Sequence, residues 1–535
     1  NLLRANFTGP VFPINPDARS VRGVRAYRSV TEVPDEVDLA VVAVPAAGMD
    51  EVMDSCLAKG VKSLLVLSSG FADAGAHGSD AQRRLVAEAR AHGMRVIGPN
   101  ALGVANTAPD VRLNATLAPE APSRGRVGFF CQSGALGIAI LAGVRDRGLG
   151  LSTFVSAGNR ADLSGNDLLQ YWQTDPDTDV VLLYLETFGN PRKFARLARR
   201  LARGKPVVAV KSGRFTAPLP SFGASSPPVD EASVQALFEQ AGVIRVQTLS
   251  QLFDTALLLA FQPLPAGPRV AVVGNSSALG VLVADALLDE GLQPAGPPVD
   301  VGAAATPERF ADAVSSAARA VDTDALIAVF VPPVATPGAA YAQALRAEVA
   351  DLDKPVLSTF LAVEGVPAEL AVPGPDGQPG PGSVPSYPSP ERAVAALARV
   401  LRYARWRDAP VGEYVRPDGI RPEDARELVR EHCRDGAEAP LPLDDAATTA
   451  LLACYRIEVT PFRLVDSVEA AMSAADELGY PVAVKGVGER WEGPELIGTR
   501  LDLGSAGAVA AAYHDLAHVT GRRELYVQRM APKGP

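Results

Sequence analysis

Two segments rich in small residues, CQSGALG at 131–137 and GNSSALG at 274–280, each join an apolar stretch to a helical pattern. Where a strand passes directly into a helix, unpaired backbone N–H groups and the positive end of the helix dipole attract phosphate. Ser133 and Gly134 in the first segment, and Asn275 and Ser276 in the second, are therefore candidate phosphate-binding residues. The other interpretation is a tight strand-to-helix connection without a ligand.

Other groups that could do chemistry have weaker support. Glu186 ends the apolar run LLYLE, where a carboxylate could act in a reaction, cap a helix or bind an arginine. Cys131 and Ser133 have no neighbouring base in the sequence, so nucleophilic catalysis is not indicated.

These residues follow apolar strands that alternate with amphipathic helices, the pattern of a parallel sheet covered on both faces. The sequence predicts strands at 11–16, 38–45, 63–70, 126–137, 180–186 and 206–211, and further ones after residue 269. Residues 372–388, rich in Pro and Gly, are predicted to form an exposed loop. The expected domains are 1–120, 124–263, 269–408 and 443–535, with a polar linker at 409–442.

The segments KSGR at 211–214 and AGVIRV at 241–246, with QSGALG and GYPVAVKG, resemble the ADP-forming acyl-CoA synthetases, relatives of succinyl-CoA synthetase. The resemblance implies an α/β fold: a Rossmann-like CoA-binding domain, two flavodoxin-like (succinyl-CoA synthetase-like) parallel-sheet domains and a partial ATP-grasp domain. It also implies that two helix N-termini face a phosphohistidine. The family prefers paired glycines where this chain has Ser277 and Ala278, and an added Cβ there would crowd a phosphate.

The same resemblance implies that CoA or acetyl-CoA binds at the carboxyl ends of the first domain's strands, where doubly wound folds bind ligands. The residues expected to line that cleft are Asn15, Pro16, Pro45, Ser69, Gly70, Phe71 and Asn100. For any one of them alone, the other interpretation is an ordinary turn residue of an α/β sheet.

In the last domain, the resemblance places Lys485 where ATP-grasp proteins contact nucleotide phosphates, and Gln528 near the adenine. ATP or ADP with Mg²⁺ is the implied ligand. The family elements that should follow the lysine are replaced here by ERWEGPELIGT, which puts nucleotide binding in doubt. No metal ligands are predicted within the sequence.

The histidine that carries phosphoryl in this family corresponds here to Phe222 or Gly223, and Glu186 to the carboxylate that orients it. Without the histidine, we expect a catalytically incomplete regulatory core that binds CoA or acyl-CoA. In one branch of the family such a core is fused to a GNAT domain in a protein lysine acetyltransferase that acts on acyl-CoA synthetases. The alternatives are an active ADP-forming acyl-CoA synthetase with another phosphoryl carrier and, with least support, an NAD-type oxidoreductase.

No GNAT domain is visible in the sequence itself. RDRGLG at 145–150 fits the R-x-x-G-x-G pyrophosphate pattern of GNAT enzymes, but it ends a predicted helix and precedes a strand. Its glycines therefore indicate a helix stop.

Composition limits the remaining possibilities. A net charge of −10 argues against a nucleic-acid binder, and no apolar run is long enough for a membrane span. Four scattered cysteines fit a reducing cytoplasm without zinc or disulfides. The expected partners are acyl-CoA, a fused GNAT domain, protein substrates and further copies of the chain.

Overall fold

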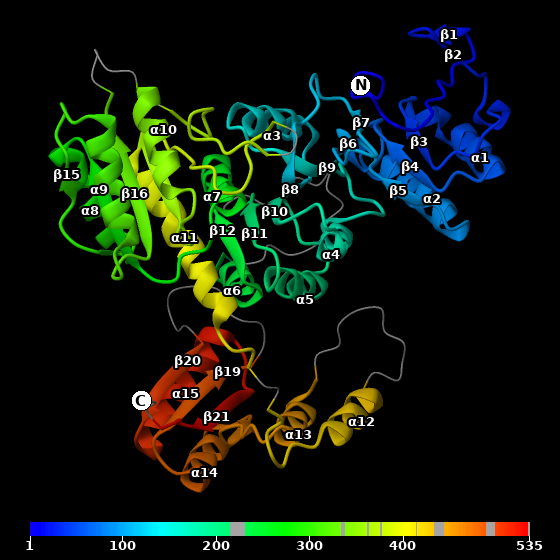
Figure 1. Ribbon diagram of the computed structural model, residues 1–535. Coiled ribbons are helices and arrows are strands. Elements are labelled where there is room, and N and C mark those ends of the chain that lie inside the picture. The colour runs from blue at the N-terminus through cyan, green and yellow to red at the C-terminus, as the bar shows by residue number, and fades with distance from the viewer. Residues whose placement is uncertain are drawn as a thin grey trace. The chain divides into compact units, whose positions relative to one another are not determined.

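The computed structural model describes residues 1–213, 231–332, 338–360, 363–374, 377–412, 415–432, 443–487 and 498–532. The chain divides into two compact units, Asn1–Pro410 and Val411–Pro535 (Figure 1). The first unit contains three main sheets in which most neighbouring strands are parallel, and the second contains an antiparallel sheet. The predicted α/β fold is confirmed.

The N-terminal sheet has the strand order β3-β4-β5, with all strands parallel. Helix α1 ends at Gly60, whose φ of +76° is a left-handed conformation that glycine adopts without strain. The elements of this region are β1 (Ser20–Val21), β2 (Val24–Arg25), η1 (Val30–Glu32), β3 (Leu39–Val42), η2 (Ala46–Gly48), α1 (Met49–Lys59), β4 (Ser63–Val66), η3 (Ala72–Ala74), α2 (Ala76–Ala91) and β5 (Arg95–Ile97).

The strand predicted at 11–16 is wrong. Only a single bridge, between Ile14 and Tyr27, forms there. Pro13 and Pro16 have no N–H to donate, so this segment cannot build a ladder of strand hydrogen bonds.

The second sheet has seven strands in the order β12-β11-β10-β8-β9-β6-β7. Strands β8 to β12 pair in parallel, whereas β6 pairs antiparallel with both β7 and β9. Its elements are β6 (Gly103–Asn106), β7 (Leu113–Thr116), β8 (Arg124–Cys131), α3 (Gly134–Asp146), β9 (Leu151–Ser156), α4 (Gly165–Thr174), β10 (Val180–Leu185), α5 (Pro191–Ala202), β11 (Val207–Lys211), α6 (Glu231–Ala241), β12 (Val243–Val246) and α7 (Leu249–Phe261). Thus β6 and β7, which precede the expected domain boundary at residue 120, are hydrogen-bonded into this sheet.

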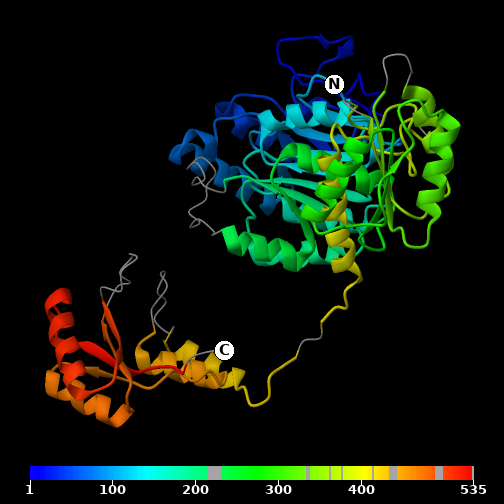
Figure 2. The same ribbon diagram turned by 90° about the vertical axis from the view of Figure 1, so that its left-hand side faces the viewer.

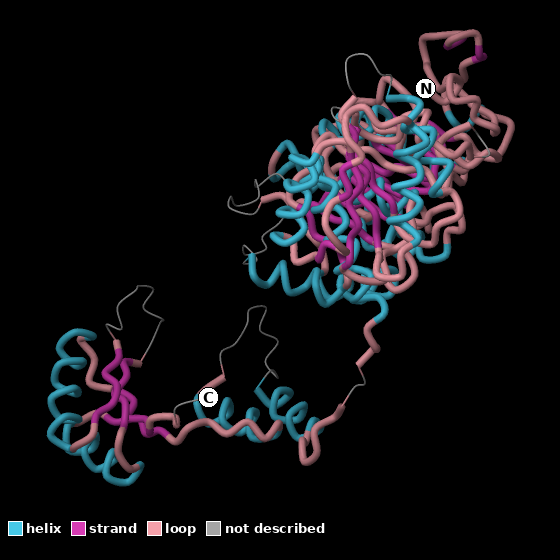
Figure 3. The backbone as a smooth tube through the Cα atoms, turned by 60° about the vertical axis from the view of Figure 1, so that its left-hand side comes forward, coloured by secondary structure: helices cyan, strands magenta, loops and turns pink. Residues whose placement is uncertain are grey.

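The third sheet is parallel, with the order β14-β13-β16-β17 and β15 also paired to β13. Its elements are β13 (Arg269–Gly274), α8 (Ser277–Asp289), β14 (Gln293–Pro294), β15 (Val299–Asp300), α9 (Pro307–Arg319), β16 (Ala325–Phe330), α10 (Gly338–Val349), β17 (Val356–Phe360) and α11 (Pro390–Asp408). In Figure 3 the strands of the first unit lie in its interior, with helices on both sides. This layering explains why the central strands are almost continuously apolar.

Helix α11, the long yellow helix of Figure 2, joins the second and third sheets because it packs against both α7 and α8. Near its start, Arg392 donates to the buried Asp254 of α7 through Nε (2.8 Å) and Nη2 (2.6 Å). Tyr387, just before α11, is fully buried and donates to the backbone oxygen of Asp254 at 3.0 Å. The described residues of 372–388 are irregular as predicted, but the prediction of an exposed loop is wrong because this end of it completes the core.

The second unit has a four-stranded antiparallel sheet in the order β18-β21-β19-β20. Helices α14 and α15 pack against each other and against the sheet. The elements are α12 (Pro422–His432), α13 (Asp445–Cys454), β18 (Phe462–Val465), α14 (Val468–Leu478), β19 (Val482–Gly486), β20 (Thr499–Leu503), α15 (Ala506–Thr520) and β21 (Leu525–Arg529). Within the described ranges, no helix of either unit is long and apolar enough to cross a membrane.

Candidate active site

The carboxyl ends of β8 and β10 are joined by the side chain of Gln132, which is buried directly after β8. Its Oε1 accepts from the backbone N–H of Glu186 (2.6 Å) and of Thr187 (3.0 Å). Its Nε2 donates to the Thr187 carbonyl oxygen at 2.9 Å. Because β8 and β10 are neighbours in the sheet, this clamp fixes the backbone that carries Glu186 next to the start of α3.

The first predicted phosphate-binding turn lies at this helix start. Ser133 caps α3, since its Oγ accepts from the Leu136 N–H at 3.4 Å. A Cβ built on Gly134 would meet nothing closer than Leu102 N, at 3.8 Å, and the Asn100 carbonyl oxygen, at 3.9 Å. Two predicted sites therefore meet here, because Asn100 was expected in the CoA cleft and Gly134 at the phosphate.

Glu186 is partly buried, and one of its carboxylate oxygens, Oε2, is enclosed without a hydrogen-bond partner. Burial raises the pKa of Glu186, and the positive charges of Arg160 and Lys211 oppose that rise. Lys211 ends β11 in register with Leu185, so it lies on the strand next to Glu186. Burial lowers the pKa of Lys211, and Glu231 and Glu186 act in the opposite direction.

Arg160 is a functional candidate that the sequence did not reveal. Its Nη1 donates to Thr187 Oγ1 at 2.8 Å, and its backbone has a φ of +54°. Burial lowers the pKa of Arg160, while the nearby Glu186 charge raises it. The one available signal was its position after the apolar strand at 151–156, because ligand-binding residues gather at strand ends.

The turn that carries Arg160 is hydrogen-bonded on both sides to elements of the N-terminal region. Asn159 donates from Nδ2 to Asp73 Oδ1 and to Gln82 Oε1, each at 3.0 Å. Asp162 accepts from Arg95 Nε at 2.8 Å and from the Val96 N–H at 2.9 Å. The position of Arg160 is therefore coupled to the loop after β4, where the CoA residues were predicted.

Some of the predicted CoA residues come together at one sheet edge. The Asn100 N–H donates to the Ser68 carbonyl oxygen at 2.9 Å, next to Ser69. A Cβ on Gly70 would lie 3.2 Å from the Ala46 Cβ, which follows Pro45. The loops after β3, β4 and β5 thus share one edge, as parallel strands require.

Three other predicted CoA residues do not present a free side chain at this edge. The side chain of Phe71 is only 1% exposed and packs in the core, so only its backbone can face a ligand. Asn15 folds a local turn by accepting from the N–H groups of Asp17 (2.9 Å) and Ala18 (3.0 Å). Pro16 lies inside that exposed turn.

The second predicted phosphate turn, at the start of α8, repeats the clamp. Asn275 donates from Nδ2 to the Val331 carbonyl oxygen (2.8 Å) and accepts from the Val331 N–H (2.9 Å). Its side-chain amide is therefore already used. Ser276 and Asp300 line a hollow of about 130 Å³ beside this turn. Phosphate binding at this turn stays a prediction.

In the second unit, the two predicted nucleotide residues touch. Lys485 on β19 donates from Nζ to Gln528 Oε1 on β21 at 2.6 Å. Gln528 in turn donates to the Thr460 carbonyl oxygen at 2.9 Å. Phe222 and Gly223, the positions expected to replace the carrier histidine, lie outside the described residues.

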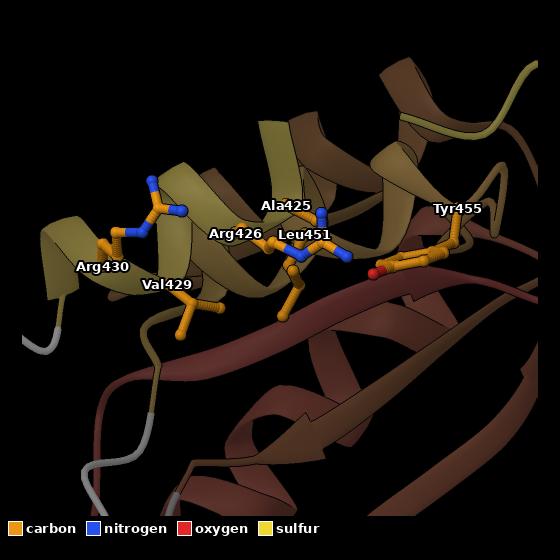
Figure 4. A pocket seen from close by; sticks show the side chains of 6 residues that line it. All are labelled: Ala425, Arg426, Val429, Arg430, Leu451 and Tyr455. Atoms are coloured by element: carbon orange, nitrogen blue, oxygen red, sulfur yellow. The ribbon is translucent and has the colours of Figure 1, made fainter. Parts of the chain in front are cut away.

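A shallow hollow of about 300 Å³ lies on α12 and α13 of the second unit. Figure 4 shows its lining by Ala425, Arg426, Val429, Arg430, Leu451 and Tyr455. None of these residues was predicted as a site residue. Within the described residues, the lining carries no carboxylate or histidine.

Comparison with known proteins decides the family. The chain is 31% identical, over 99% of its length and 78% of the relative, to acetate–CoA ligase (ADP-forming) I of Archaeoglobus fulgidus. It belongs to the ADP-forming acyl-CoA synthetase family. The α subunit of the ADP-forming acetate–CoA ligase I of Pyrococcus furiosus is also 31% identical, over 76% of this chain and 92% of that subunit.

Other comparisons agree with this synthetase assignment. Residues 1–107 match a CoA binding domain, 124–259 a succinyl-CoA ligase like flavodoxin domain, and 437–535 an ATP-grasp domain. The Candidatus Korarchaeum cryptofilum dinucleotide-forming acetyl-coenzyme A synthetase 1, solved in complex with phosphate and ADP, is 32% identical. The structural match has a TM-score of 0.68 and covers 76% of this chain and 91% of the synthetase chain.

The expectation of a catalytically dead regulatory core is wrong. It rested on the missing carrier histidine, the replaced glycine pair at 277–278 and the altered element after Lys485, whereas similarity to ADP-forming synthetases extends over nearly the whole chain. The acetyltransferase and pseudoenzyme interpretations are not supported by these relatives. The alternative weighed beside them, an active synthetase, fits better.

Proposed function

We propose that this chain catalyses ADP-forming acyl-CoA synthesis, in which a carboxylic acid, CoA and ATP yield acyl-CoA, ADP and phosphate. The observation that carries the proposal is the 31% identity to an acetate–CoA ligase over 99% of the chain. The cluster around Glu186 supports it, because a carboxylate and two cations at strand ends suit the binding and transfer of an anionic group.

Within this proposal, the loops after β3, β4 and β5 bind CoA, and Lys485 and Gln528 bind the nucleotide. Ser133 and Gly134 offer the N-terminus of α3 to a phosphate group. We expect ATP to bind with Mg²⁺, as the sequence resemblance implies. Among the described residues, no group of three or more His, Cys, Asp and Glu side chains is arranged to hold a metal.

Acetate is the first acid to test, because several relatives are named acetate–CoA ligases, although others are named for 4-hydroxybutyrate and trans-ferulate. Self-association and a cytoplasmic location remain predictions. The GNAT domain and protein substrates form no part of the proposal, since they followed from the regulatory interpretation.

The decisive experiment measures ADP release by the purified chain with ATP, Mg²⁺, CoA and acetate, and with each substrate omitted in turn. The expected result is ADP and acetyl-CoA formation that needs both acetate and CoA. Glu186→Gln should lose most of this activity, while the exposed Glu36→Gln should retain it. Acyl-CoA binding without any ADP release, across a panel of acids, would refute the proposal.

The same samples can identify the phosphoryl acceptor, since Phe222 and Gly223 cannot carry phosphoryl. Incubation with radiolabelled ATP, followed by acid treatment and peptide mapping, separates two cases. A labelled nitrogen phosphoramidate is lost in acid, whereas a serine or threonine phosphoester survives. Turnover without any labelled protein would indicate direct transfer between substrates.

A further inference from the structure

Arg160 has donor groups that the protein does not use. Among the described residues, its Nη1 bonds to Thr187, whereas Nε is enclosed without a partner and Nη2 has none that the structure records. An unpaired polar group that is partly withdrawn from water raises the free energy of the folded state. A donor held in this way is suited to a ligand that arrives later.

Glu186 presents the complementary feature. It is close enough to Arg160 for each charge to shift the pKa of the other, yet no ion pair or hydrogen bond joins them in the described part of the chain. Its Oε2 is buried without a partner, and its Oε1 has no recorded donor. Two opposite charges are therefore held side by side without neutralising each other.

The surrounding structure keeps the two groups in this arrangement. Gln132 fixes the backbone N–H groups of Glu186 and Thr187, and Thr187 Oγ1 accepts from Arg160. Asn159 and Asp162 anchor the turn on either side of Arg160. Both side chains therefore project from backbone that neighbouring residues hold in place.

A ligand that satisfies both groups must accept a hydrogen bond from Arg160 and donate one to Glu186. A carboxylate only accepts, but a monoprotonated phosphate group has both charged oxygens and a hydroxyl. Gln132, which bonds the Glu186 backbone, directly precedes the N-cap of α3. The start of this 13-residue helix adds backbone N–H groups and the positive end of the helix dipole.

We propose that Arg160 is the binding residue for the phosphate group of the reaction, with Glu186 accepting from that group's hydroxyl. The same chemistry could come from inorganic phosphate or from the phosphoryl end of an acyl phosphate. The role of this phosphate as a reactant rests on the proposed function, whereas its binding at Arg160 does not.

The test is calorimetric titration of the whole chain with inorganic phosphate and, separately, with acetyl phosphate, without nucleotide. Wild type should bind, and Arg160→Gln should bind at least ~10-fold more weakly, which corresponds to about 1.4 kcal/mol. Arg160→Lys should be intermediate, because an ammonium keeps the charge but not the planar fork. Arg200→Gln, on the exposed surface of α5, is the matched control and should bind as wild type does.

Unchanged CoA affinity and melting temperature in Arg160→Gln would show that the variant is folded. Phosphate binding that is equal in wild type and Arg160→Gln, or absent from wild type with both probes, would overturn the inference. Phosphate binding that depends on Arg160 in a chain without ligase turnover would instead refute only the proposed function. Tighter binding of one probe identifies which phosphate source the site takes.

Discussion

The side-chain amide of Asn159 lies 3.0 Å from the Asp73 carboxylate, although the two residues are 86 positions apart in the sequence. Asp73 in turn accepts from the Gly70 N–H at 2.9 Å and the Phe71 N–H at 3.1 Å. One carboxylate therefore shapes the predicted CoA loop and anchors the turn that carries Arg160.

Replacing Asn159 with alanine should weaken CoA binding and lower stability by about 1 kcal/mol, the usual effect of losing one hydrogen bond. Asn159→Asp should be worse, because it places a second negative charge against Asp73. Calorimetric CoA affinity and chemical denaturation of the three proteins measure both effects. Equal CoA affinity in all three would contradict the coupling between turn and loop.

Replacing Gln132 with methionine should reduce kcat by roughly 100-fold, since small displacements of a positioned group have effects of this size. The change leaves the N–H groups of Glu186 and Thr187 without their acceptor. Gln262→Met is a matched control, because Gln262 makes a similar backbone clamp, to Ser383 and Val356, beside the third sheet. We expect the control to lose stability while kcat per folded molecule stays near wild type.

Asp162 should make the stability depend on acid pH. Burial alone would raise the pKa of Asp162, but hydrogen bonds from Arg95, the Val96 N–H and Arg90 outweigh it and leave that pKa below its ordinary value of 3.8. The stabilisation is therefore complete above the unfolded pKa and is lost as pH falls through the folded one.

Urea denaturation of wild type and Asp162→Asn tests this linkage. At pH 6 the variant should be less stable by about 1–3 kcal/mol, and the difference should shrink towards pH 3. Asp179→Asn, which removes an exposed ion pair with Arg126, should change stability little at any pH. Two curves that stay parallel from pH 6 to pH 3 would show that Asp162 does not contribute as described.

Cys131 should be chemically silent although it adjoins the site. Burial raises its pKa to about 12 and that of Cys56 to about 11, so neither forms thiolate at pH 8. Thiol labelling of the native chain at pH 8, followed by peptide mapping, should leave both unmodified and ligase activity intact. Rapid labelling of Cys131 would mean that the end of β8 opens readily.

The strands and helices were predictable wherever the apolar pattern was long, as in β8 followed by α3 and β13 followed by α8. The segment at 11–16 failed because its prolines outweigh its apolar residues. The hydrogen-bond partners of Gln132 could not be predicted from the sequence, for a different reason. Contact with Thr187, 55 residues away, requires knowing that β10 lies beside β8, and an alternating pattern does not reveal strand order.

In the candidate site too, some residues could be predicted from the sequence pattern and others could not. The predicted Ser133, Gly134, Glu186 and Asn100 were visible because they follow strands. Arg160 and Asn159 sit in a turn that Asp73 and Arg95 anchor from the N-terminal region, and the sequence pattern does not reveal those contacts. The functional interpretation was wrong because it gave a few missing motif residues, the carrier histidine among them, more weight than the similarity of the whole chain. A phosphoryl carrier is one residue, whereas the scaffold that binds the substrates involves dozens.

The clamp made by Gln132 after β8 is repeated by Asn275 after β13. Among side chains, only the amides of Asn and Gln offer a donor and an acceptor on two separate atoms while remaining uncharged at every physiological pH. Both positions are thus closed to nearly all other side chains, whatever reaction the surrounding residues support. Substitutions that change substrate preference are therefore expected in neighbouring turn residues, such as those at 157–163. Gln132 and Asn275 themselves should tolerate few replacements.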